Sequence, residues 1–327
     1  MQHSRPNVTP RPFGSRFPPA AGAAVMATGI VSVGFRLTGH DVLSGILLVL
    51  AVALWVLLAA DFTLRLMHDR SRWRHEAISP PALTAVAATC VLGTRFSLLG
   101  RQWLASALLV IAALAWPGLL VAVVRHWKRR MPGAVFLACV ATQGLAVLGA
   151  TLSAAVGVRW LGYAAVVVFW FGLVMYVAAF ARFDRRQVLT GAGDHWVAGG
   201  ALAISALAAA KLVLAGRAGD LWNSDVTGVL RDMCGVLLTL DVAWYVVLAV
   251  AEVLEPRFTY DVRRWSTVFP MGMTAVATLT VATAVETPWL KAPGQVLLWI
   301  AATVWLVVAT GAVRSLGPPS LRSRAPR

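Results

Sequence analysis

Residues 132–156 read PGAVFLACVATQGLAVLGATLSAAV, and residues 160–180 read WLGYAAVVVFWFGLVMYVAAF. Both stretches suit a membrane-spanning helix, because a bilayer core about 30 Å thick needs about 20 mostly apolar residues. The first contains 13 Gly, Ala, Ser or Thr residues and 1 aromatic residue, whereas the second contains 6 and 7. Small side chains let helices approach closely in a membrane, and bulky apolar ones suit a lipid-facing surface. The pair predicts an inner helix followed by an outer one.

The same alternation extends along the whole chain. Ten apolar windows occur, at residues 20–38, 43–67, 81–99, 103–125, 132–156, 160–180, 196–215, 229–252, 266–285 and 292–313. Gly, Ala, Ser and Thr make up 55 of 103 residues in the odd-numbered windows but only 35 of 115 in the even-numbered ones. Aromatic residues number 5 and 15, respectively. We therefore expect an all-α polytopic membrane protein of ten transmembrane helices, five inside and five outside, which together form a membrane conduit.

The overall composition agrees with this reading. Hydrophobic residues make up 59% of the 327 residues and charged residues only 13%, far from the usual soluble range. The windows leave room for a tail at 1–17, a transmembrane domain at 18–313 and a basic tail at 314–327. Residues 1–18 are polar and contain Arg and Pro, unlike the apolar core of a signal peptide. A cleaved signal followed by nine spans is the alternative.

The basic residues lie mostly on one side of the predicted membrane domain. Of the 29 Lys and Arg residues, 21 fall in the tails and in the loops on that side, and 8 fall on the other. Cytoplasmic loops of membrane proteins carry such an excess. We therefore expect both termini to be cytoplasmic in a cell inner (plasma) membrane protein. The net charge of +15 is explained by this distribution and does not call for nucleic acid as a partner.

Residues typical of enzymes and metal sites are missing from the pattern. The three cysteines, Cys90, Cys139 and Cys234, stand singly in different windows and have no metal-ligand spacing. The sequence also lacks zinc-protease, dinucleotide-binding and phosphate-loop motifs. Asp194 and His195 are expected to cap and anchor the seventh span. We therefore predict no catalytic residue, no metal and no cofactor.

Carboxylates inside a membrane are costly and are functional candidates by default. Asp61 has Arg65 four residues later, which favours a structural ion pair on one helix face. Asp241 lies near the middle of the eighth window without a local basic partner. We expect it to contact a neighbouring helix, with a proton relay as the alternative.

The inner windows supply the candidates for a pore lining. Their interiors contain neutral hydroxyl and amide side chains, and their outer ends contain basic ones. The lining candidates are Thr28, Ser32, Thr89, Thr142, Gln143, Ser205 and Thr274, and the basic outer mouth would contain Arg36, Arg95 and Lys211. A pore without acidic rings disfavours cations, and a basic mouth concentrates anions. The alternative for each hydroxyl is a hydrogen bond to its own helix or to a neighbouring one.

Several inner windows contain residues that favour kinks. These candidates are Gly29, Gly144, Gly199, Pro270 and Gly272. Helix breakers are tolerated in membranes where a neighbouring helix or a water-filled cavity satisfies the freed backbone groups. Close helix packing through small residues explains the glycines equally well.

Two segments resemble a known family. They are AVMATGIVS at 24–32 and RRWSTVFPMGM at 263–273. Together with the span pattern over about 18–313, they resemble the tellurite-resistance/dicarboxylate transporter family of TehA proteins, yeast sulfite and malate permeases and plant slow-type anion channels. The resemblance implies five helical hairpins, with the odd helices forming a quasi-fivefold central pore. It also implies a homotrimer with one pore per protomer.

In that family a phenylalanine of the ninth helix occludes the pore, and it matches Phe269 here. Phe269 is the one aromatic residue of its window, and the adjacent Pro270 favours a kink because it lacks a backbone donor. Its alternative role is ordinary packing. We therefore expect an anion channel or transporter of the inner membrane that passes small inorganic or organic anions through a phenylalanine-gated pore. The alternatives are a proton-coupled exporter of sulfite, tellurite or malate-like C4-dicarboxylates and, more remotely, an intramembrane enzyme.

Overall fold

The computed structural model describes residues 21–68, 71, 76–256 and 260–316. Within them the chain forms helices and no β-strand, only an isolated bridge between Met131 and Phe183. The expected tail at 1–17 and most of the tail at 314–327 lie outside the described residues. The longer helices are α1 (Gly22–Leu37), α2 (Asp41–His68), α4 (Thr84–Ser97), α5 (Gln102–Arg125), α6 (Leu137–Val156), α7 (Arg159–Phe180), α9 (Val197–Gly219), α10 (Ser224–Leu254), α11 (Trp265–Ala284) and α12 (Lys291–Leu316).

Within the described residues, four short helical turns directly precede inner spans, and two more lie in the loops between helices. They are η3 (Pro80–Leu83), η4 (Gly133–Phe136), α8 (Gln187–Thr190), η5 (Asp194–Trp196), η6 (Val262–Arg264) and η7 (Pro288–Leu290). The Asp194 carboxylate accepts a hydrogen bond from the Ala134 backbone at 3.3 Å, so it caps the turn before α6. We expected Asp194 to cap its own span, but its side chain joins the N-terminal starts of two inner spans.

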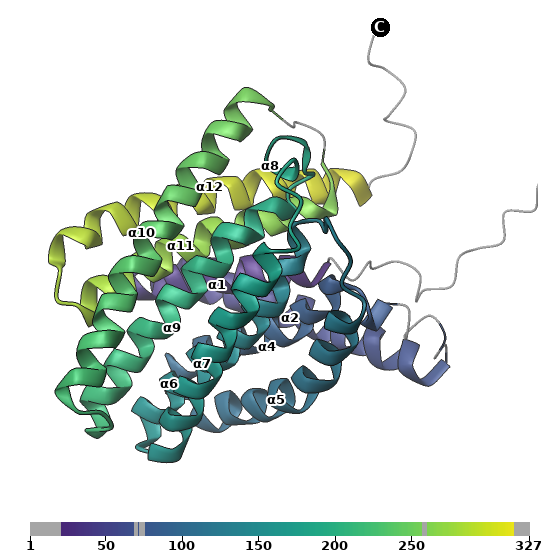
Figure 1. Ribbon diagram of the computed structural model, residues 1–327. Helices are drawn as coiled ribbons and strands as arrows, with labels where there is room; N and C mark the ends of the chain where they lie inside the picture. Colours follow the sequence, from purple (N-terminus) through teal and green to yellow (C-terminus); the bar gives the residue numbers. More distant parts are fainter. Residues whose placement is uncertain (1–20, 69–70, 72–75, 257–259, 317–327) are drawn as a thin grey trace, which may run out of the picture.

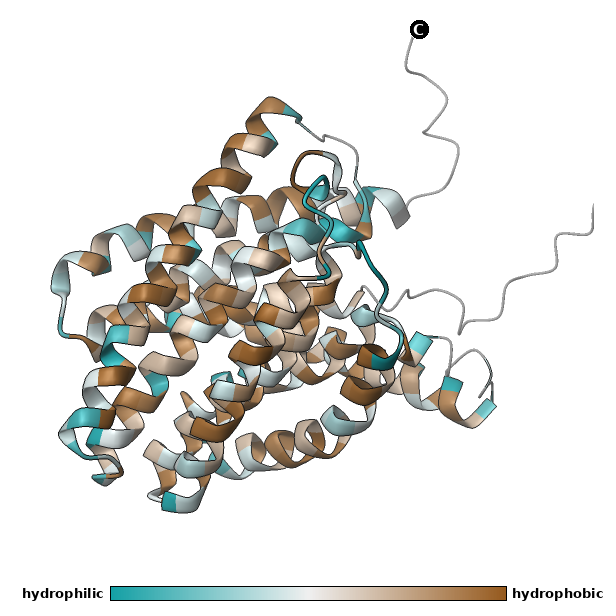
Figure 2. Cartoon of the chain, in the orientation of Figure 1, coloured by the Kyte–Doolittle hydropathy of each residue, from teal (hydrophilic) through white to brown (hydrophobic). Residues whose placement is uncertain are grey.

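Side-chain size separates the helices into two layers. In its most apolar window, the small-residue segment Gly133–Val156 is 100% buried, whereas the bulky helix α7 is 22% buried. The remaining spans follow the same rule, so the small-residue helices are enclosed by protein and the bulky helices are largely exposed. Figure 2 shows the hydrophobic residues that run along outer helices such as α5 and α10.

The five inner helices close into a ring. Helix α1 packs against α4, α4 against α6, α6 against α9, α9 against α11, and α11 returns to α1. Each inner helix also packs extensively against the outer helix that follows it in sequence, as α6 does with α7 and α9 with α10 in Figure 1. The centre of this ring is therefore bordered only by inner helices.

Eight of the described helical segments are long and apolar enough to cross a membrane. Helix α1 has the right character but only 16 residues. The segment of η3 and α4 matches the third expected span but is less apolar, since it contains Arg95 and several threonines. Both helices are enclosed by protein, so they need less apolarity than a helix that faces lipid. The chain is thus an all-helical, multi-pass membrane protein.

Candidate permeation pathway

A narrow cavity of about 20 Å³ lies at the centre of the inner ring. All five inner helices line it, mostly with apolar side chains. Two residues from each helix mark its extent: Ile30 and Leu37, Cys90 and Leu98, Gly144 and Val147, Ile204 and Lys211, and Met273 and Thr280. In each pair of α1, α4, α9 and α11, the second residue lies towards the C-terminal end of its helix. The cavity therefore occupies the half of the ring where the inner helices end.

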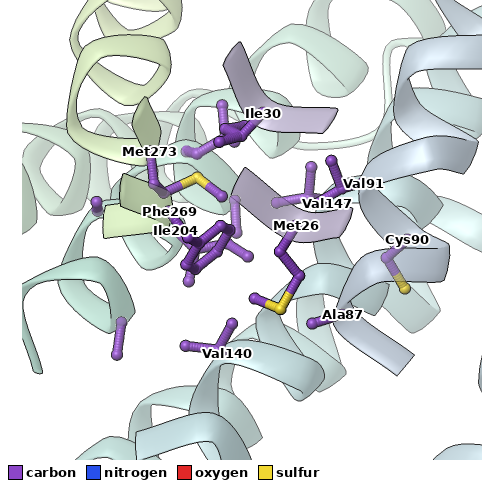
Figure 3. Packing of buried hydrophobic residues seen from close by; sticks show 14 of the residues in the cluster. Met26, Ile30, Ala87, Cys90, Val91, Val140, Val147, Ile204, Phe269 and Met273 are labelled. Carbon is purple, nitrogen blue, oxygen red and sulfur yellow. The ribbon is translucent and has the colours of Figure 1, made fainter. Parts of the chain in front are cut away.

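Phe269 lies beyond the inner end of this cavity. It precedes the lining residue Met273 by about one helical turn on α11, and it is only 1% exposed. Figure 3 shows its ring among Met26, Ile204 and Met273, in a cluster to which every inner helix contributes. Phe269 thus packs within the central cluster of inner-helix side chains, one turn from the cavity.

Lys211 is the one charged residue among those that line the cavity. It is half-buried on α9, and no hydrogen bond or ion pair to it occurs within the described chain. An ammonium group without a counterion in an apolar cavity creates a positive potential there.

The other two basic candidates are placed differently. Arg36 forms an ion pair with Asp41 in the turn between α1 and α2, so its charge is compensated. Arg95 is 2% exposed and donates to the Ser44 hydroxyl at 2.9 Å and to the Ser32 hydroxyl at 3.1 Å. Neither arginine lines the cavity. Arg95 clamps the α1–α2 pair to α4, and its Nη1 atom has no hydrogen-bond partner.

The seven neutral polar candidates do not line the cavity either. Five of them lie one on each inner helix, and each hydroxyl donates to the backbone carbonyl four residues earlier. These bonds are Thr28 to Ala24 (2.8 Å), Thr89 to Ala85 (2.7 Å), Thr142 to Ala138 (2.8 Å), Ser205 to Ala201 (2.7 Å) and Thr274 to Pro270 (3.1 Å). Such bonds satisfy a hydroxyl inside a membrane without water.

Four of these hydroxyls also contact an outer helix. Three accept an indole N–H: from Trp305 to Thr28 (3.0 Å), from Trp55 to Thr89 (2.9 Å) and from Trp116 to Thr142 (3.0 Å). In the fourth, Thr274 donates to the Asp241 carboxylate of α10 at 3.2 Å. The hydroxyls thus face outwards and join the two layers, and the alternative of contacts within and between helices describes them better than a pore lining.

The two remaining polar candidates have similar roles. Ser32 and Ser44 exchange hydrogen bonds between α1 and α2, with each hydroxyl donating to the other residue's carbonyl. The Gln143 amide donates to the Phe169 carbonyl of α7 at 3.1 Å. The tryptophans that meet the threonines were not singled out from the sequence. Their recurrence within even-numbered windows was the signal that could have identified them.

The glycine and proline candidates serve close packing in continuous helices. Helices α1, α6, α9 and α11 continue through Gly29, Gly144, Gly199 and Pro270. A Cβ atom added to Gly29 would lie 2.8 Å from Val91, and one added to Gly272 would lie 2.8 Å from Ile30. Such distances leave no room for a methyl group, so these glycines set how closely α1 approaches α4 and α11. Gly144 also lines the cavity.

The intramembrane carboxylates are both in contact with other groups. Asp61 pairs with Arg65, as expected, and Arg65 also pairs with Glu76.

In η6, just before α11, Arg263 donates to Asp261, and this contact lowers the pKa of the Asp261 carboxyl. A separate apolar groove of about 760 Å³ lies between α2 and α5. Most of the inner ring does not contribute to it, so it is no candidate for a central pathway.

Comparison with known families gives a match over residues 16–313 to the SLAC1 family, described as voltage-dependent anion channels. The match spans almost the whole transmembrane domain and confirms the resemblance found in the sequence. A comparison with curated proteins gave no match. The ring of small-residue helices, its central cavity and the family match together establish that this chain belongs to the voltage-dependent anion channel family.

Proposed function

We propose that this protein passes small inorganic or organic anions through a pathway along the axis of its inner helix ring, one pathway per chain. The central cavity carries this proposal, because every inner helix lines it and Phe269 lies at its inner end. Five helical hairpins would arrange the odd spans as a quasi-fivefold pore. The closed ring of inner-helix contacts supports that arrangement.

The charges near the cavity favour anions over cations. Lys211 brings a positive charge into the lining, and no Asp or Glu is among the lining residues. Cation channels typically present rings of acidic side chains. Lys211 would attract an anion that enters the cavity. The apolar walls offer few hydrogen-bond donors to replace the hydration shell of the anion.

Phe269 is proposed as the gate. An aromatic ring across a narrow apolar passage blocks ions, since they would have to lose water without replacement. Pro270 follows directly and leaves one carbonyl of α11 without its usual helical donor. This weak point in the helix supports a gate that moves by local bending.

Phe269→Ala tests the gate. We expect a large, constitutive anion conductance in planar bilayers, because the substitution removes the side chain that fills the axis. Phe169→Ala on α7 is the matched control, since Phe169 is also fully buried but lies between layers. The control should lose about 3–5 kcal/mol of stability on the scale of soluble cores and gain no current. A folded Phe269→Ala protein with wild-type current would refute the gate.

A proton-coupled exporter of sulfite, tellurite or C4-dicarboxylate anions is the second candidate. The buried carboxylate of Asp241 favours it, because coupling needs a titratable group within the membrane. Ohmic anion current without a pH gradient would favour the channel, and strict dependence on a gradient would favour the exporter.

We also propose a homotrimer in the inner membrane with both termini in the cytoplasm. The exposed bulky side chains of the outer helices, such as Trp170 and Phe171, support contacts with lipid or with other copies. The uneven distribution of basic residues supports the orientation. Only monomers in native mass spectrometry from mild detergent would contradict the trimer.

A further inference from the structure

Asp241 is a buried carboxylate whose hydrogen bonds the proposed gate does not yet explain. It lies near the middle of α10 and is 0% exposed. Its Oδ1 atom accepts from Thr274, and its Oδ2 atom has no hydrogen-bond partner. Burying an ionised carboxylate with only one hydrogen bond is unfavourable, whereas a neutral carboxylic acid can be buried at much lower cost.

No cation faces this carboxyl group. Ion pairs of the described chain do not include it, and α11 contains no ionisable side chain between Trp265 and Ala284. On α9, the neighbouring backbone is at Gly199, and Lys211 lies three turns further along. The titratable groups that interact with Asp241 are the phenols Tyr176 of α7 and Tyr245 of α10, and phenols are neutral near neutral pH. A proton on the carboxyl group itself is the simplest way to neutralise it.

The repeated contacts of the inner ring show what a proton would do here. At Thr28, Thr89 and Thr142, the hydroxyl accepts an N–H from an outer tryptophan and donates to the carbonyl four residues earlier. Thr274 has one hydrogen but two acceptors, the Pro270 carbonyl at 3.1 Å and Asp241 at 3.2 Å. The Thr274 hydroxyl can bond well to both groups only if Asp241 is protonated. Asp241 then donates to the Thr274 oxygen, as the tryptophans do elsewhere, and Thr274 donates to Pro270.

We infer that Asp241 is a proton-binding site that controls the Phe269 gate through Thr274 and the Pro270 carbonyl; this inference rests on the proposed function of Phe269. With a proton bound, the carboxyl O–H donates to Thr274, and the Thr274 hydroxyl holds the Pro270 carbonyl. When the proton leaves, the Thr274 hydroxyl donates its hydrogen bond to the carboxylate. The Pro270 carbonyl then loses its side-chain donor. This loosens α11 next to Phe269, so the proton stabilises the closed pathway and raising the pH favours opening.

Anion flux from vesicles that contain the full-length protein, with equal pH on both sides, tests the inference. We expect wild-type flux to rise about fivefold or more from mildly acidic to alkaline pH, the lower end of typical coupling between two sites. Asp241→Asn keeps an N–H donor and cannot ionise, so its flux should stay low at every pH. Thr274→Val removes the donor to Pro270, so its flux should be high at every pH.

Asp241→Asn and Thr274→Val should therefore change flux in opposite directions. If the contact only packed the helices, both variants would destabilise the protein and change flux in the same direction. Thr142→Val is the matched control, since it removes an equivalent hydroxyl that meets a tryptophan, and it should keep the wild-type pH dependence. Infrared difference spectra should show the carbonyl band of a protonated acid in wild type at neutral pH and not in Asp241→Asn. Wild-type flux without pH dependence, an unaltered pH profile in Asp241→Asn, or absence of this band would each overturn the inference. If the inference about Asp241 fails, Phe269→Ala still tests the gate by itself. Flux through this variant at all pH values would support the gate, whereas no flux would count against it.

Discussion

At the scale of single residues, the position of a charge decides its effect more than its presence does. Arg36 is paired with Asp41 and Arg95 is buried against two serines, but Lys211 points its free charge into the central cavity. All three lie in the C-terminal halves of their inner helices. Only a charge that has no ion-pair partner and lines the cavity can attract an anion into it.

Lys211→Met should therefore reduce anion flux through the open pathway. We expect a loss of about tenfold at low salt, the lower end of what a focused field contributes to association rates. The loss should shrink at high salt, where charges are screened over about 3 Å at 1 M. Flux measured in the Phe269→Ala background isolates this effect from gating. Arg217→Gln is the control, because Arg217 lies on the same helix but pairs with Glu286, and it should leave flux unchanged. Equal fluxes in both variants would exclude an electrostatic role for Lys211.

At the scale of helices, the two layers are joined by a repeated hydrogen bond. An outer tryptophan and an inner threonine satisfy each other where neither can reach water, and this occurs between α2 and α4, between α5 and α6, and between α12 and α1. Each bond links an outer helix to the inner helix of the next pair in the ring. The bonds therefore tie neighbouring pairs together, rather than the two helices of one pair.

Trp55→Phe, Trp116→Phe and Trp305→Phe should each lower the free energy of unfolding by about 0.6–2 kcal/mol, the range for hydrogen bonds between membrane helices. Phenylalanine keeps an apolar aromatic ring but is smaller than tryptophan, so each loss combines the hydrogen bond with some packing. Unfolding in mixed micelles, followed by circular dichroism, measures it. Trp103→Phe is the control, since Trp103 is 70% exposed on α5. A loss at Trp103 as large as at the other three would show that the repeated bond contributes nothing specific.

At the scale of the whole molecule, the arrangement of charged loops predicts how the protein lies in the membrane. Arg101 and Lys128 flank the two ends of α5, and both are exposed. The native cysteines Cys90, Cys139 and Cys234 are buried and should not react. Arg101→Cys should react with an impermeant maleimide added to intact cells, whereas Lys128→Cys should react only after the cells are permeabilised. The reverse pattern would contradict cytoplasmic termini.

Much of the architecture could be predicted from the sequence, because helix length, apolarity and side-chain size are properties of each segment by itself. The small residues of 132–156 and the aromatic residues of 160–180 identify an inner and an outer helix before any contact is known. The ion pair between Asp61 and Arg65 is similarly local, since four residues on a helix bring two side chains to one face.

The directions of the polar side chains on the inner helices were decided only by the tertiary structure. A helix enclosed by protein on every side has no polar face in its sequence to mark the centre of the ring, so Thr28, Thr89 and Thr142 could point inwards or outwards. Their orientation depends on donors from helices far away in sequence, as Trp305 is from Thr28. The same holds for Lys211 and Arg95, of which one faces the cavity and the other a pair of serines. Composition determined which helices surround the centre, and long-range hydrogen bonding determined which side chains face it.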